Sequence, residues 1–276
     1  MNLEITKSDF ESAIPAAREP KSKVFEAMTD ALQLEVMQLE EQCLGEKGVQ
    51  AVEEIQDLTL VNVVKNLVCV RAFLREMRGL DLVLTATGFG VVSTQDTAPA
   101  SKMRVDALEG QLRRQERLLL GTLLDRLFRV EGWNLQVQRQ LQVQTLFYTI
   151  QLLETFGGIN HPKAEDWDAA VPVMLSADAF LRKHLGNAYM DELMQQLTSH
   201  SLSVQNQPVA IMCQMYIGAC IAQNNKLKEE TYMRLINRLE ADLSLYQTYA
   251  GSEAYRLNHF TPYENHAEDS AFHFVG

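Results

Sequence analysis

The sequence has few cysteines, and no two of them have the spacing of a metal-binding or redox pair. Cys43, Cys69, Cys213 and Cys220 are the only cysteines in 276 residues, and none lies in a CxxC motif. Each belongs to an apolar pattern with helical spacing, where a free thiol behaves as a small hydrophobic side chain. We therefore expect reduced cysteines in the core, and neither a disulfide framework nor a cysteine-bound metal.

Long apolar runs are also missing. The longest, Ile211–Ala222, is too short to span a bilayer and is typical of a buried core helix. The first fifteen residues hold no basic stretch followed by an apolar one, so no secretory signal is expected. We expect no membrane partner.

Motifs that carry catalysis or ligand binding are not found. The sequence has no GxSxG, no HExxH, no GK[ST] and no aspartate-rich calcium loop. His259, His266 and His273 are seven residues apart, whereas zinc ligands on one helix are three or four apart, and Pro262 argues against a helix there. The sequence therefore predicts no catalytic, cofactor-binding or metal-binding residues, and a protein that is not an enzyme.

Basic residues are outnumbered over the whole chain but not in its middle. The net charge is −11, which makes a general nucleic-acid binder improbable. Residues 65–129 nevertheless hold eleven of the 25 basic side chains and seven of the 36 acidic ones. Two interpretations stay open: solvated helix faces with ion pairs such as Glu109–Arg113, or a moderately basic surface that faces a polyanion. The candidates for the second are Arg71, Arg75, Arg78, Arg113, Arg114 and Arg117.

Apolar residues recur with helical spacing through most of the chain, so we expect a mainly α fold, a helical bundle. Ser8 and Glu11 have the spacing of a capping box at the first helix. The expected longer helices cover 23–44, 52–78, 101–132, a glutamine-rich 134–156, 164–200, 207–223 and 228–250.

Two short segments repeat at one fixed offset. DFESAIP at 9–15 matches DWDAAVP at 166–172, and EVMQ at 35–38 matches ELMQ at 192–195 at the same offset. This leaves open whether the chain holds two duplicated helical units. The expected division is an N-terminal helical unit 1–133, a connecting helix 134–158, a C-terminal helical unit 159–251 and an extended tail 252–276.

One stretch, LVLTATGFGVVSTQDTAPAS at 82–101, interrupts the helical pattern. A phosphate-binding glycine loop leads directly into a helix, but here the next helix starts about ten residues after Gly90. β-Branched runs on both sides of ATGF instead predict a β-hairpin arm over 82–95, between long helices. An isolated hairpin is marginally stable, so its own helices or another molecule must cover it. The candidate oligomer or partner contacts are Val83, Thr87, Phe89, Val91 and Val92.

Through TGFGVVS (87–93), APASKMRVDAL (98–108) and YENHAEDSA (263–271), the chain resembles an uncharacterised family encoded in phages and prophages of anaerobic gut bacteria. The resemblance covers the whole chain and implies a virion structural protein, similar to a head–tail connector (adaptor), present in the virion and in the host cytoplasm during assembly. The implied partners are further copies of the chain in a ring, other virion proteins such as a portal, and DNA that passes transiently and without specificity through the channel. Another virion-assembly or tail-completion protein, or a generic helical interaction module, are the alternatives.

Overall fold

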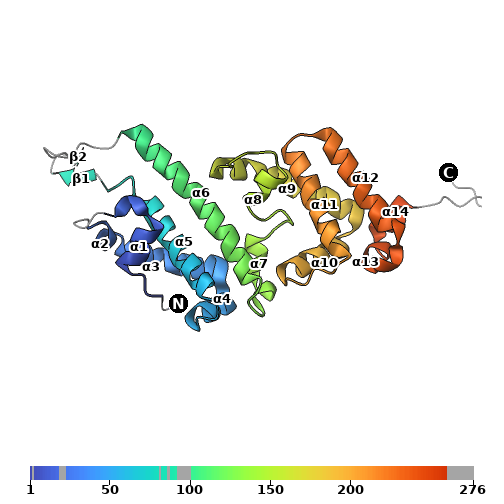
Figure 1. Cartoon of the computed structure of the whole chain (residues 1–276), viewed down its shortest axis with the longest axis horizontal. Helices are drawn as coiled ribbons and strands as arrows, with labels where there is room; N and C mark the ends of the chain where they lie inside the picture. Colours follow the sequence, from blue (N-terminus) through green and yellow to red (C-terminus); the bar gives the residue numbers. More distant parts are fainter. Residues whose placement is uncertain (2, 19–22, 81, 86–87, 92–100, 260–276) are drawn as a thin grey trace, which may run out of the picture.

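The computed structural model consists of two helical lobes that lie next to each other along the long axis of the molecule (Figure 1). It describes residues 1, 3–18, 23–80, 82–85, 88–91 and 101–259, with the backbone alone in 82–85 and 88–91. The expectation of a mainly α fold is confirmed.

The first lobe is built around α5, which contacts α1, α3 and α6. The Asp57 side chain accepts a hydrogen bond from the backbone N–H of Thr59 (2.8 Å) and so caps the start of α5. Buried residues lie on most of the circumference of α5, as expected for a helix enclosed by others. The α-helices of this lobe are α1 (Lys7–Ala13), α2 (Val24–Ala27), α3 (Thr29–Leu39), α4 (Gly45–Glu53), α5 (Leu58–Glu76) and α6 (Lys102–Leu127).

The first helix starts earlier than predicted, because Thr6 and not Ser8 is its N-cap. The Thr6 hydroxyl accepts from the Asp9 N–H (3.2 Å), and the Asp9 carboxylate accepts from the Thr6 N–H (2.9 Å). The capping box is therefore present, with Asp9 in the place expected for Glu11.

The helical segment predicted over 23–44 is confirmed in extent, but it is not one regular α-helix. It consists of α2, α3 and a π-helical turn, η2 (Glu40–Leu44), which leads into α4. Gly45, the first residue of α4, has a φ of 60°, and an added Cβ there would lie 2.6 Å from the Gln138 side-chain oxygen. The chain can change direction at this point because glycine has no side chain to clash.

The predicted connecting helix over 134–158 is wrong. The segment holds the 3₁₀ turn η3 (Trp133–Leu135), α7 (Val137–Gln142), an irregular stretch at 143–148 and α8 (Gln151–Thr155). Its glutamines bind the end of the first helical run instead of solvent: Gln136, Gln138 and Gln142 donate to the carbonyls of Leu44, Glu41 and Gln42 (3.0–3.3 Å). These bonds satisfy backbone carbonyls around the π-helical turn. They also hold the segment against the surface of the first lobe.

The second lobe is built around α11, which contacts α9 and α12. The helix predicted over 164–200 is split at Gly186, whose φ of 90° ends α9. The predicted extended tail is helical over its first residues, because the Ser252 hydroxyl accepts from the Tyr255 N–H (3.0 Å) and caps α14. The α-helices of this lobe are α9 (Ala164–Leu185), α10 (Asn187–Thr198), α11 (Asn206–Ile221), α12 (Asn225–Ala241), α13 (Gln247–Ala250) and α14 (Glu253–Asn258).

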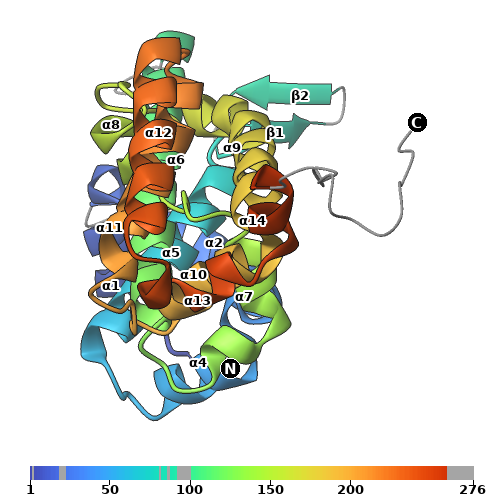
Figure 2. The ribbon, with the colours of Figure 1, turned by 90° about the vertical axis from the view of Figure 1, so that its right-hand side faces the viewer.

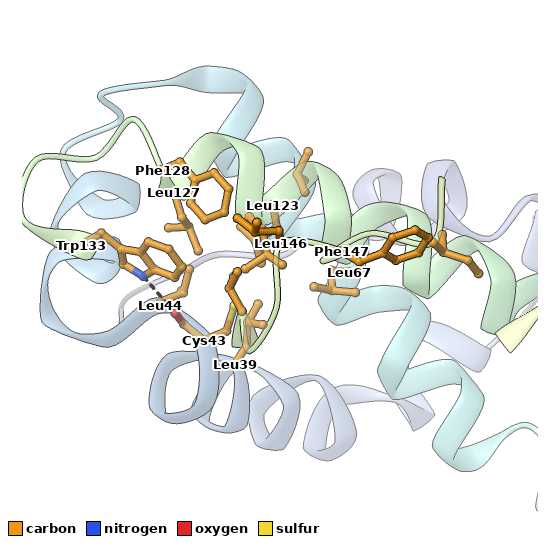
Figure 3. Packing of buried hydrophobic residues seen from close by; sticks show 14 of the residues in the cluster. Leu39, Cys43, Leu44, Leu67, Leu123, Leu127, Phe128, Trp133, Leu146 and Phe147 are labelled. Atoms are coloured by element: carbon orange, nitrogen blue, oxygen red, sulfur yellow. Dashed lines mark hydrogen bonds between the residues drawn. The ribbon is translucent and has the colours of Figure 1, made fainter. Parts of the chain in front are cut away.

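A hydrophobic cluster extends through both lobes, and residues far apart in the sequence meet in it. Figure 3 shows the indole of Trp133 next to Phe128 and Leu44, with its N–H donating to the Cys43 carbonyl (3.1 Å). The expectation of free core cysteines is confirmed: Cys43, Cys69 and Cys213 are buried and Cys220 is half-buried. Burial raises the pKa of the Cys43 and Cys69 thiols to about 12, so both stay protonated near neutral pH.

The two matching sequence segments have the same local role but not the same helix length. Asp166 accepts from the Lys163 N–H (2.7 Å) at the start of α9, as Asp9 accepts from the Thr6 N–H in α1. The first helix ends before Pro15, whereas α9 continues through Pro172. The duplication stays a prediction.

Between α5 and α6 the chain forms two short strands, β1 (Leu82–Thr85) and β2 (Gly88–Val91). They pair antiparallel, from Leu82 opposite Val91 to Thr85 opposite Gly88. Figures 1 and 2 both place the strands at the periphery of the molecule. Gly88 and Phe89 therefore belong to the second strand rather than to the turn.

Candidate interaction surfaces

The paired strands carry three of the five residues predicted to contact another chain. Val83 lies opposite Gly90 in the ladder, Phe89 opposite Leu84, and Val91 opposite Leu82. The other two, Thr87 and Val92, lie outside the described residues. The strands follow α5 and precede α6, so the α5–α6 pair forms the base from which this segment leaves the lobe (Figure 1).

The seam between α5 and α6 is crossed by Arg71 of α5 and by Arg78, which lies two residues after the end of α5. The Arg71 Nε lies 2.8 Å from a Glu116 oxygen. The Arg78 Nη2 lies 2.8 Å from Asp106, and its Nε donates to Glu109 (2.7 Å). The hydrogen bond from Arg113, together with that from Arg78, holds the pKa of Glu109 below its usual range, although burial acts to raise it. These pairs join the two helices directly below the strands.

Arg75 is held by α3 instead of α6. Its Nε donates to Glu35 (2.9 Å) and its Nη2 to the Gln38 side chain (2.9 Å). Glu35 is only 4% exposed, so its carboxylate depends on this arginine for charge compensation. The arginine therefore stabilises the packing of α3 on α5.

The predicted Glu109–Arg113 ion pair is confirmed, at 2.8 Å. Together with the pairs above, it gives four of the six candidate polyanion-facing arginines a carboxylate partner within the first lobe. The nearby carboxylates reduce the positive potential that these guanidinium groups present to solvent. Contact with a polyanion stays a prediction.

The remaining two candidates, Arg114 and Arg117, reach the second lobe. The Arg114 Nε donates to the Pro162 carbonyl (3.0 Å), and the Arg117 Nη2 lies 2.7 Å from an Asp168 oxygen. Both partners lie at or near the start of α9. The distribution of arginines in the sequence does not indicate that these two contact the second lobe, because their partners are 48 and 51 residues away in the sequence.

A mainly apolar pocket of about 210 Å³ lies between the two lobes, close to the Arg117 contact. Helix α6 forms one wall with Leu120 and Leu124, and α9 forms another with Trp167 and Met174. The irregular stretch before α8 supplies Phe147. Nothing in the sequence indicates this pocket, because its residues come from three separate segments with the apolar pattern of an ordinary core.

Within the residues that the structure describes, no group of three or more histidine, cysteine, aspartate or glutamate side chains could hold a metal ion. Of the three equally spaced histidines, His259 follows α14, and its Nε2 lies 3.1 Å from Glu240, while His266 and His273 lie outside the described residues. No helix in this part of the chain is long and apolar enough to cross a membrane.

Comparison with known proteins finds one family model, described as a family of unknown function (DUF6712), which matches residues 27–140. This region, less than half of the chain, runs from α2 to α7 and includes the paired strands and the arginines of the α5–α6 seam. No curated protein and no solved structure matches.

Proposed function

We propose that this chain is a non-enzymatic structural protein of a phage or prophage virion, a head–tail connector that forms a ring and contacts a portal. The observation that carries the proposal is the position of β1 and β2: they leave the first lobe between two long helices and lie at the edge of the molecule (Figures 1 and 2). The resemblance described above supplies the virion context.

The strand pair needs a cover that it does not supply itself. Each strand has four residues, and the sheet has two strands. Such a sheet is marginally stable in water unless its apolar face is buried. A neighbouring subunit supplies that cover, and a contact between two different surfaces of identical chains closes into a ring when its rotation allows.

The base of the strand pair is rigid enough to present it. Arg71 of α5 and Arg78, just after its end, bind three carboxylates of α6, and Arg75 connects α5 to α3. In the ring, this seam is also the surface that we propose to lie closest to DNA in the channel. Another virion-assembly role, or a generic helical interaction module, are the alternatives.

The test of the proposal is the assembly state of the full chain in solution. Size-exclusion chromatography with light scattering should show a defined high-order oligomer, or a complex with a portal protein when the two are mixed. Electron microscopy of that species should show rings. A strict monomer that binds no virion component would contradict the connector function.

The strand segment has its own test. Deletion of residues 85–94 should leave the helical circular dichroism unchanged and abolish assembly, because the proposed contact is lost while the core is not. Val204→Ser, at a 79% exposed position of the second lobe, is the control and should assemble normally. Loss of folded protein on deletion would show that the segment belongs to the core.

A further inference from the structure

A second, polar pocket lies between the lobes, where α7 faces α10. It has a volume of about 470 Å³. Arg139 from the first lobe and Arg182 from the second are its cationic residues, and Asp191 is its single carboxylate. The other lining residues are mostly amides: Asn134, Gln140, Gln144 and Gln195, with Leu135, Val143 and Met194.

The two arginines differ in how their charge is compensated. The Arg182 Nε lies 2.7 Å from Asp178, and its Nη1 lies 2.7 Å from Asp191. Arg139 forms no ion pair within the described part of the chain, and its Nε donates only to the Asn134 carbonyl (3.3 Å). Burial lowers the pKa of Arg139, and the nearby negative charge of Asp191 opposes this effect without cancelling it. A half-buried guanidinium with free N–H groups is suited to a carboxylate, which it can bind in a bidentate manner.

The chain itself contains a segment with the complementary charge. Residues 260–276 hold Glu264, Glu268 and Asp269 and no lysine or arginine. The segment begins directly after α14, where the Asn258 side chain donates to the His184 carbonyl (3.4 Å). His184 and Arg182 belong to the same last turn of α9, so the segment begins at the end of the helix that carries the pocket.

We infer that the pocket binds the acidic segment 260–276 of the same chain, with a carboxylate of that segment on Arg139. Five residues from His259 to Glu264 span up to about 17 Å, and ten residues to Asp269 about 33 Å. Binding would place the end of the second lobe against α7 of the first. This inference does not depend on ring assembly.

The experiment is photo-cross-linking in the full chain, with p-benzoylphenylalanine in place of the exposed Gln140. Trypsin cuts after Arg256 and at no later residue, so the segment is recovered in one peptide that begins at Leu257. We expect a cross-link between residue 140 and that peptide, at the mass of a single chain. The yield should fall when the salt is raised to about 0.5 M, because salt screens exposed charges.

Arg139→Gln should lower the cross-link yield at least about fivefold, as expected for the loss of a charge-assisted hydrogen bond. Arg234→Gln, at an exposed position of α12, is the matched control and should leave it unchanged. The triple variant Glu264→Gln, Glu268→Gln, Asp269→Asn should give the same loss as Arg139→Gln, and it keeps the test valid if the latter does not fold. Equal yield in Arg139→Gln and its control, a different cross-linked peptide, or a cross-link between two chains would each overturn the inference.

Discussion

At the scale of single residues, several polar side chains of the first lobe hold secondary structure in place. Asp9 is the clearest case, because its carboxylate accepts from the Thr6 N–H, from the Thr6 hydroxyl and from the Lys65 ammonium (2.9–3.0 Å). Lys65 belongs to α5, so Asp9 both caps α1 and connects it to the central helix. One side chain thus contributes to a helix start and to helix packing.

The pKa of Asp9 leads to a pH-dependent prediction. Burial raises this pKa, but the hydrogen bonds from Thr6 and Lys65 outweigh that effect and leave it below its usual value. The carboxylate therefore stabilises the fold above the unfolded pKa near 4, and this contribution is lost as the pH falls through the lower folded pKa. Asp9→Asn should lower the free energy of unfolding by about 1 kcal/mol at pH 7.

Urea unfolding followed by circular dichroism should show that the difference between Asp9→Asn and the parent chain shrinks below pH ~4. Glu229→Gln, on an exposed part of α12, is the control and should change stability little at any pH. An Asp9→Asn effect of constant size from pH 7 to pH 3 would rule out the ionised carboxylate as its cause.

Residue-level predictions from sequence succeeded where the partner is local. Glu109 and Arg113 are four residues apart on one helix, so their ion pair followed from spacing alone. Ser8 failed as the N-cap because Thr6 and Ser8 both have suitable side chains, and only the backbone decides between them. Arg114 and Arg117 were grouped with the other arginines by charge, since nothing in the sequence indicates that the second lobe lies beside them.

At the scale of elements, the long periodic helices were predictable and the breaks between them were not. The expected helices over 101–132 and 207–223 correspond to α6 and α11 within a few residues. Residues 134–156 have a helical composition, yet glutamine side chains of this segment bind carbonyls of the first lobe, and Leu146 and Phe147 are buried in the core. Tertiary contacts outweighed local propensity in that segment.

The packing of α11 on the end of α8 gives an element-scale prediction. A Cβ added at Gly218 would lie 2.5 Å from the Phe156 carbonyl oxygen, which is part of the backbone and has little freedom to move. Gly218→Ala should therefore destabilise the protein by about 2–3 kcal/mol, in spite of the higher helix propensity of alanine.

Gly110→Ala in α6 is the matched control, because nothing lies within 4 Å of the added Cβ. It should stabilise the protein by about 0.5–1 kcal/mol. Thermal and urea unfolding of both variants measure the difference. If Gly218→Ala were as stable as Gly110→Ala, α8 and α11 would have to be packed less closely than the structure shows.

At the scale of the whole molecule, a small set of polar contacts accompanies the apolar packing between the lobes. Arg114 and Arg117 join α6 to the start of α9, and Gln214 on α11 donates to the Leu146 carbonyl (3.0 Å). His200, which follows α10, makes an edge contact with Phe128 near the end of α6. These contacts set the relative position of the two lobes.

The double variant Arg114→Gln, Arg117→Gln should weaken this connection without unfolding either lobe. We expect the helical circular dichroism to stay unchanged. The single thermal unfolding transition expected of the parent chain should separate into two in the variant, and the radius of gyration measured by X-ray scattering should increase. Arg113→Gln is the control, because Arg113 pairs with Glu109 on its own helix. If the double variant matched the control in transition and radius, apolar packing alone would hold the lobes together.

The sequence by itself determined the helical class and the buried thiols, because each depends on periodicity or composition within a short window. The tertiary structure decided where the helices break and which side chains the arginines and glutamines bind. It also decided that Arg139 and Arg182, 43 residues apart, line one pocket. Those features depend on contacts between distant segments, and no local pattern records which distant segment will supply the partner.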